Sequence, residues 1–568
     1  MTKIIDKKYL FITLAGICFL LYLIRISSYV LVDFLDETKY AAVLSEMHGV
    51  KSLLVPYIDG KITFGAGIFY YFFVKISTLI FGRMGEFALR LPSVLCTFAT
   101  LAAVFAFTKR MVNKKFAIII TLSLFANIAF LVSSSVSSPK LFSACFITIA
   151  VLSCCMPAFI ERFERKPYYY FSFWFFSLLA ALSGEISCFM LPFVIVFPVL
   201  IICNKFREFI EPKNIFPGLL TYVLCLSLYF FAGYKLFSYD FLYFIGASSA
   251  PQIFCGNMEE KLLHIIKNDG LFLVLGGLPW ILSFLTIFAS LFVKIFREIF
   301  IHKTPIKQIT FDEGRKFFLI SIWAIVCSLC YAFIWHKDSF DIFLTFFFFM
   351  SFTSGYYWYR NIDSDAHKKA VFIPSLLFYI MLVLATVVLT ASYFFVTPLQ
   401  KEYVEPLIIP IMVITLFVSV PGLIAVVLKR KVLNFSMHIT FSILFFFFLT
   451  GLLYNYVSSF GENDLINFAE KAKQDNAMLA TYNVRNKYSM IYYYAAPVIF
   501  NGEMDFEQVY DNYGDTRNVY LVLKHSDLAY MDRFFVYEVV STGKVYCEIT
   551  NIKYLPKDEI KEDKDINN

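Results

Sequence analysis

Apolar runs long enough to cross a membrane recur along nearly the whole chain, and they exclude most soluble folds. A membrane-spanning helix needs about 20 consecutive, mostly apolar residues. The chain has 568 residues, of which 59% are hydrophobic, whereas a soluble domain is nearer half. We therefore expect an all-α polytopic membrane protein whose spanning helices lie at 9–31, 87–107, 116–133, 141–160, 168–183, 186–203, 217–236, 270–296, 317–335, 339–356, 371–396, 404–428 and 434–457.

One more run, residues 65–82, contains Lys75 and either spans the membrane or lies in its interface. Lys and Arg collect on the cytoplasmic side of membrane proteins, and this bias separates the two interpretations. If 65–82 does not span and the N-terminus is cytoplasmic, every cytoplasmic segment is basic, including 109–115 and 429–431. If it spans, 109–115 falls outside. The sequence thus predicts thirteen spans, with the N-terminus inside and the C-terminus outside.

The chain divides into three parts by composition. Residues 1–457 form the predicted membrane domain, with interfacial helices in a first outer loop at 32–86. Residues 458–556 are less apolar and predict a small α/β domain on the outer face, because a helical pattern at 463–474 precedes strand-like segments rich in Val, Tyr and Phe at 476–484, 489–500, 518–526 and 533–549. Residues 557–568 are charged and predict a disordered tail.

Acidic residues gather directly after the first apolar run, in the stretch 33–47, DFLDETKYAAVLSEM. On one interpretation Asp36 merely caps a helix, where negative charge is favoured. The stretch is also amphipathic, with Tyr40, Val43, Leu44 and Met47 on one side, which predicts a helix lying flat on the outer surface. Asp36 and Glu37 would then face a groove, as a general base or as ligands of a divalent cation beside a lipid phosphate.

The segment 31–107 resembles a known family. The stretches DETKYAAVLSEM, VPYIDGK and YYFFVKISTLIFGRMGEFALRLPSVL are similar to the start of the membrane glycosyltransferases of the C-type fold. The closest group holds the bacterial lipid A aminoarabinose transferases and the protein O-mannosyltransferase relatives. The resemblance is thinner elsewhere, at 276–280, at 336–345 and in the C-terminal domain.

This resemblance implies thirteen spans and a reaction. A sugar would move from a polyprenyl-phosphate carrier to a lipid, glycan or protein acceptor at the periplasmic face of a bacterial inner membrane. The family's catalytic Asp falls on Asp36, with Glu37 beside it.

Several positions depart from the family pattern. The Glu-Lys-Pro element falls on Gly65-Ala66-Gly67, and a second outer acid falls near Ser138, where no carboxylate stands. A Lys-Gly pair becomes Ser183-Gly184, and an aromatic position falls near Asp341. We therefore name no metal ligand, although a divalent cation stays an option that these losses weaken.

Three lysines in predicted outer segments are candidate replacements for the lost cations: Lys61, Lys140 and Lys337. Lysine is a normal phosphate binder, and with Tyr40 and Asp341 these residues form the predicted substrate-binding set. Taken singly, each lysine is explained more readily as an interfacial side chain that reaches toward water.

Two other functional classes are possible for a chain of this composition. A catalytically degenerate paralogue would bind a lipid-linked glycan or a partner without turnover. A transporter would show repeats or charges in mid-span, whereas here the charges cluster at span ends. No basic stripe with interleaved aromatics indicates nucleic-acid binding.

Overall fold

The computed structural model describes part of the chain, in several segments. They are residues 22–24, 26, 31, 36–47, 52, 54–58, 61–63, 66–81, 86–160, 166–184, 186–249, 267, 270, 272–296, 313–335, 343–362, 368–395, 408–459, 462–482, 484, 499–500 and 519–554.

Seven helices in these segments are long and apolar enough to cross a membrane. They are α4 (Glu86–Met111), α7 (Pro139–Phe159), α11 (Pro212–Phe237), α15 (Glu313–Trp335), α17 (Lys368–Phe395), the segment Ile408–Val427 with η8 (Thr415–Ser419) and α19 (Val420–Val427), and α20 (Lys431–Ser459). The described residues thus form a multi-pass membrane protein, but the predicted count of thirteen spans is not confirmed.

Three predicted spans are interrupted. The run 116–133 forms α5 (Lys114–Phe125) and α6 (Ile128–Ser134), bent by 66°. Asn127 starts the second piece, because its side chain accepts a hydrogen bond from the amide of Phe130 at 3.0 Å. The run 186–203 forms η3 (Ile186–Phe189) and α9 (Leu191–Ile202), and 270–296 yields α14 (Ile281–Phe296). With 12 residues, α9 is about 18 Å long, short of a ~30 Å hydrocarbon core.

The ambiguous run 65–82 forms α3 (Ile68–Ile80). Its 13 residues give a length of about 20 Å, so this helix is also shorter than a normal span. Other helices in the described membrane part include α8 (Lys166–Ser183), α10 (Phe206–Phe209), α12 (Tyr239–Ser249) and α16 (Leu344–Ile362).

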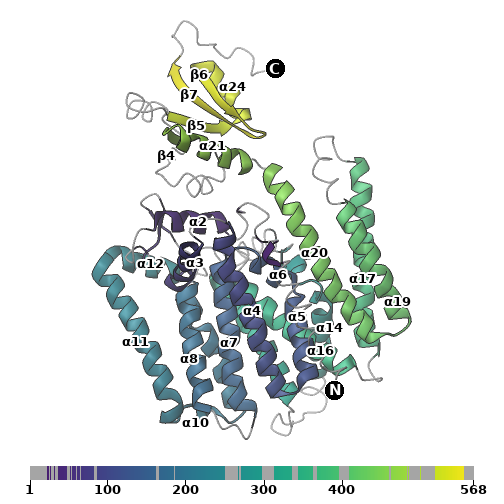
Figure 1. The fold of residues 1–568 in the computed structure, drawn as a ribbon. Coiled ribbons are helices and arrows are strands. Elements are labelled where there is room, and N and C mark those ends of the chain that lie inside the picture. Colours follow the sequence, from purple (N-terminus) through teal and green to yellow (C-terminus); the bar gives the residue numbers. More distant parts are fainter. Residues whose placement is uncertain are drawn as a thin grey trace, which may run out of the picture.

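The helix α2 (Glu37–Glu46) lies across the end of the bundle formed by α3, α4, α7 and α8 (Figure 1). The amphipathic pattern predicted one apolar face and one exposed face. The structure corrects this, because Thr38 and Ala42, on the opposite side of the helix from Tyr40, are buried as well, and so is Ala41 between them and Tyr40. The helix is packed on several sides and is not a surface helix with one solvent-exposed face.

The C-terminal part is an α/β unit, as expected. Helix α21 (Glu462–Gln474) precedes a five-stranded sheet in the order β4-β3-β5-β7-β6. The strands are β3 (Met478–Thr481), β4 (Ile499–Phe500), β5 (Val519–Lys524), β6 (Phe535–Thr542) and β7 (Tyr546–Tyr554), with α24 (His525–Phe534) between β5 and β6. Strand β3 is parallel to β4 and β5, and β7 is antiparallel to β5 and β6.

Side chains alternate between the two faces of this sheet. Tyr520 and Val522 pack with residues of α21, whereas Leu521 and Leu523 pack with Met531 of α24. Both faces are therefore covered. Segment 489–498 of the predicted strands lies outside the described residues, and the domain limits 458–556 stay a prediction.

The sheet and α21 lie at the same end of the helix bundle as α2, while α10 lies at the opposite end (Figure 1). The predicted topology requires this arrangement, since it places both the first outer loop and the C-terminal domain outside. Which side of the membrane this end faces stays a prediction.

Candidate functional site

Asp36 directly precedes α2 and has a left-handed backbone, with φ 58° and ψ 23°. Only a few per cent of non-glycine residues adopt positive φ, and Asp is one of the types that tolerate it. The side chain makes no capping hydrogen bond to the helix. Asp36 is thus the N-cap residue of α2 by position, but its side chain does not form the hydrogen bond that a capping side chain normally makes.

Glu37 and Arg90 form a fully buried ion pair that joins α2 to α4. Arg90 Nε donates to Glu37 Oε1 and its second terminal nitrogen donates to Oε2, each over 2.7 Å. Both side chains are 0% exposed. Arg90 also donates to the carbonyl of Ile26 at 2.7 Å. A forked guanidinium on a carboxylate fixes orientation as well as charge, so this pair locks the start of α2.

Ser137 connects this ion pair to the segment before α7. Its amide donates to Glu37 Oε1 at 3.0 Å, and its hydroxyl donates to the carbonyl of Leu89 at 2.8 Å. Since that single proton is used, the Tyr70 hydroxyl, 2.7 Å away, is the donor to Ser137 Oγ. The next residue, Ser138, where the family pattern led us to expect an acid, is the buried N-cap of α7.

Three buried tyrosines stand beside the two acids. The rings of Tyr40 and Tyr70 meet edge to face at 5.7 Å, and those of Tyr70 and Tyr71 at 5.2 Å. Burial, with smaller contributions from Tyr70 and from the charge of Asp36, raises the pKa of Tyr71 well above its usual value. The predicted binding residue Tyr40 is thus placed beside Glu37, which precedes it by three positions in α2.

Lys75 of α3 holds the other end of α2. Its Nζ donates to the carbonyls of Met47 at 3.1 Å and of Leu44 at 3.5 Å. Cations are favoured at helix C-termini, where carbonyl groups lack partners. Both ends of α2 are therefore fixed by charged side chains from neighbouring helices.

For the other predicted binding residues the structure gives the element in which each lies, or does not describe the residue. Lys140 is half-buried at the second position of α7, three residues beyond Ser137. Lys61 lies in β2 (Lys61–Ile62), which pairs with β1 (Tyr57–Ile58). Lys337 and Asp341 lie outside the described residues.

Two of the positions that depart from the family pattern are in contact. The amide of Gly67 donates to the carbonyl of Ser183, and Ser183 Oγ donates to the carbonyl of Leu179. Ala66 and Ser183 are both buried. The two lost lysine positions thus belong to one neutral, closely packed region where α3 begins and α8 ends.

No group of three His, Cys, Asp or Glu side chains comes together in the described segments in a way that would hold a metal ion. The side chains seen there therefore do not fit a metal centre, and the reaction proposed below does not use a metal ion.

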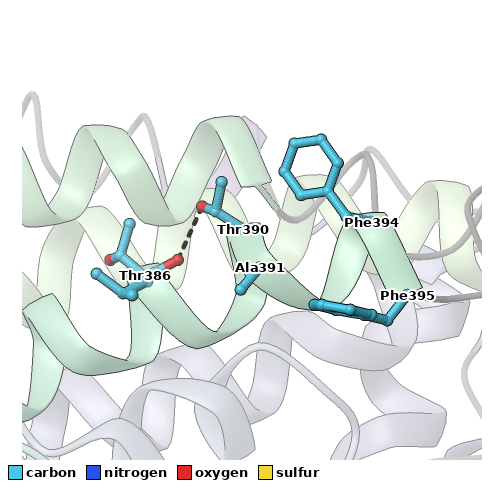
Figure 2. Close-up of a pocket in the computed structure, with 6 residues that line it drawn as sticks. Thr386, Thr390, Ala391, Phe394 and Phe395 are labelled. Carbon is cyan, nitrogen blue, oxygen red and sulfur yellow. Dashed lines mark hydrogen bonds between the residues drawn. The ribbon is translucent and has the colours of Figure 1, made fainter.

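A described pocket of about 530 Å³ lies elsewhere, on α17. It is an open, apolar groove lined by residues of that one helix (Figure 2). The Thr390 hydroxyl, which lines the groove, already donates a hydrogen bond to the carbonyl of Thr386 at 2.8 Å. In Figure 1, α17 and α2 stand on different sides of the bundle, and this groove is no part of the site.

Sequence reasoning missed Arg90, Ser137, Tyr71 and Lys75 as parts of the site. Arg90 carried a usable signal, because an arginine inside the apolar run 87–107 requires a buried acidic partner. The partner is 53 residues away in the chain. Ser137 carried no such signal, because its contact to Glu37 is made by a backbone amide.

No family model and no curated protein matches this chain. Among solved structures, it is similar to ArnT from Cupriavidus metallidurans bound to undecaprenyl phosphate, with a TM-score of 0.72 and 12% identity over 95% of this chain and 97% of that chain. The apo state of the same ArnT has a TM-score of 0.68 and 12% identity, over 96% of this chain and 98% of that chain. The oligosaccharyltransferase of Archaeoglobus fulgidus has 12% identity over 95% of this chain and 72% of that chain. Its TM-score of 0.39 is too low to support an argument. The resemblance to the aminoarabinose transferases is thus confirmed at the level of the fold.

Proposed function

We propose that this protein is a membrane glycosyltransferase that moves a sugar from a polyprenyl-phosphate donor to a hydroxyl acceptor, with Asp36 as the general base. The observation that carries the proposal is the left-handed Asp36 beside a locked Glu37. Unusual backbone conformations that their surroundings hold in place gather at functional sites. The ArnT-like fold supports the donor class, since that protein was solved with undecaprenyl phosphate.

The reaction is a substitution at the anomeric carbon of the sugar. The Asp36 carboxylate takes the proton of an acceptor hydroxyl, and the acceptor oxygen bonds to the anomeric carbon. The bond from that carbon to the phosphate oxygen breaks at the same time, and its electron pair leaves with the lipid phosphate. The products are the glycosylated acceptor and a polyprenyl phosphate.

Glu37 has a different role in this proposal. Both of its oxygens accept hydrogen bonds and its side chain is 0% exposed. A carboxylate held this way is poorly placed to take a proton from a substrate. We assign it as a positioning residue that, with Arg90, sets the place of Asp36.

The leaving phosphate needs positive charge nearby. Lys140 is the described lysine that fits best, because it lies in the first turn of α7, where the helix dipole also attracts anions. Lys61 and Lys337 are assigned the same role, and Tyr40 and Asp341 are assigned to substrate binding. Action at the periplasmic face of a bacterial inner membrane completes the proposal.

The experiment compares a deletion strain complemented with wild type, Asp36→Asn or Asp240→Asn, by mass spectrometry of surface glycans and lipid-linked sugars. Asp240 is the control acid, because it lies in α12 and accepts a hydrogen bond from Tyr57 at 3.2 Å. We expect Asp36→Asn to behave like the deletion at equal protein level, and Asp240→Asn to restore the glycan.

The neutral region around Gly67 and Ser183 favours one alternative, a catalytically degenerate paralogue that binds a lipid-linked glycan without turnover. Full restoration of the glycan by Asp36→Asn would remove Asp36 as the base. A deletion strain with an unchanged glycan profile would favour the degenerate binder.

A further inference from the structure

Two adjacent tyrosines of α3 use their hydroxyl groups differently. Tyr70 is 0% exposed and its hydroxyl donates to Ser137 Oγ at 2.7 Å. Tyr71 is 1% exposed, yet its hydroxyl makes no hydrogen bond in the part of the chain that the structure describes. Buried tyrosine hydroxyl groups normally find a partner, so the second tyrosine requires an explanation.

The Tyr71 hydroxyl is also not sealed inside the protein. Seventeen enclosed side-chain polar atoms lack a partner in the described segments, and Tyr71 Oη is not one of them. The small accessible area of Tyr71 therefore includes this oxygen. An otherwise buried phenol with an accessible, unused hydroxyl is suited to a ligand atom.

The surroundings fix what this hydroxyl offers to a ligand. Burial is the main reason that the pKa of Tyr71 lies well above its usual value, and the negative charge of Asp36 adds to it. The phenol thus keeps its proton at every working pH and serves as a hydrogen-bond donor. The effect of Asp36 also shows that the hydroxyl lies within electrostatic reach of the proposed base.

We propose that Tyr71 is a donor-binding residue whose hydroxyl donates a hydrogen bond to a phosphate oxygen of the lipid-linked sugar. Phosphate oxygens are strong acceptors, and hydrogen bonds to charged acceptors are about twice as strong as neutral ones. The inference rests on the proposed function, because it takes the ligand to be a lipid phosphate. The hydrogen bond from Tyr71 would replace part of the phosphate binding that is lost where the resembled family has lysines, at Ala66 and Ser183.

The test measures binding of undecaprenyl phosphate to the purified full chain in detergent, for wild type, Tyr71→Phe and Tyr70→Phe. We expect Tyr71→Phe to weaken the lipid phosphate about 10-fold or more, the effect of losing a hydrogen bond to a charged group. Undecaprenol, which lacks the phosphate, should bind wild type and Tyr71→Phe equally. Tyr70→Phe is the matched control, since its hydroxyl serves Ser137, and it should lower thermal stability without this loss of affinity.

The outcomes separate the two proposals. Wild type that binds undecaprenyl phosphate, with Tyr71→Phe binding equally well, would overturn the role of Tyr71 and leave the proposed function intact. Wild type that does not bind undecaprenyl phosphate would overturn the donor class and this inference with it. Equal weakening by Tyr70→Phe would show a general effect on packing and would also overturn the role of Tyr71.

Discussion

The backbone N–H of Gly67 donates a hydrogen bond to the carbonyl oxygen of Ser183 over 3.0 Å, tying the start of α3 to the end of α8. A Cβ atom at residue 67 would lie 2.3 Å from the carbonyl oxygen of Leu182. The resembled family has proline at this position, and proline has no N–H to donate. The departure from the family is therefore matched to the local packing of this chain.

Replacing this glycine should destabilise the protein. For Gly67→Ala we expect a loss of roughly 1–3 kcal/mol, the usual cost of overpacking, and a larger loss for Gly67→Pro, which also removes the hydrogen bond. Thermal unfolding of the purified protein in detergent measures both. The control is Gly246→Ala, because a Cβ there meets nothing within 4 Å. Equal melting temperatures for Gly67→Ala and Gly246→Ala would contradict the packing that we describe.

Glu37→Gln should be strongly destabilising. It removes the buried carboxylate that two nitrogens of Arg90 bind, and breaking a buried ion pair costs roughly 3–5 kcal/mol. The control is Glu211→Gln, since the pair of Glu211 with Lys213 is exposed and such pairs contribute about 0–1 kcal/mol. Denaturation in detergent gives the comparison. The double variant Glu37→Leu with Arg90→Met should lose less stability than Glu37→Gln alone. If its loss instead equals the sum of the losses of Glu37→Leu and Arg90→Met made singly, the two residues are not coupled.

Lys75→Met should loosen the C-terminal end of α2. The substitution removes the donors to the carbonyls of Leu44 and Met47, and a charge at a helix end contributes about 0.3–1 kcal/mol. Hydrogen–deuterium exchange of peptides covering 37–47 should become faster, while Lys75→Arg, which keeps a cationic donor, should change little. Unchanged exchange in Lys75→Met would mean that other contacts hold this end.

The C-terminal domain should lose stability as the pH rises toward 8. Glu548 on β7 is 0% exposed and both of its oxygens lack a hydrogen-bond partner among the described residues. Burial raises its pKa from 4.5 to about 8, with Lys471 opposing and Asp475 adding to the shift. The folded domain therefore holds this proton more tightly than the unfolded chain does. The stabilisation is complete below about pH 4.5 and is lost by about pH 8.

Glu548→Gln should remove this pH dependence, because an amide has the same shape and no charge. The ratio of exchange rates between Glu548→Gln and wild type, for amides of β5 and β7 in the full chain, measures the effect, since intrinsic rates cancel in the ratio. The ratio should fall as the pH rises from 5 to 8. A ratio that stays constant over this range would show that Glu548 does not titrate there.

The sequence alone predicted much of the local structure. Strands β5 and β6 lie within the segments predicted as strands, whereas β7 starts in the predicted segment 533–549 and continues to Tyr554. The seven helices suited to spanning each overlap one of the predicted apolar runs. Asp36 could also be singled out, because acids directly after an apolar run are conspicuous. These features depend on the composition of neighbouring residues, which a sequence shows directly.

Only the tertiary structure decided how the runs break and what the acids contact. The run 116–133 bends at Asn127, whose side chain replaces a backbone partner, and composition does not reveal this. The sequence makes Glu37 a catalytic candidate next to Asp36, yet in the structure it is bound to Arg90 and to the amide of Ser137, 53 and 100 residues away. The physical reason is that hydropathy reports the preference of each side chain for lipid or water, whereas a buried charge is placed by partners that folding brings from distant parts of the chain.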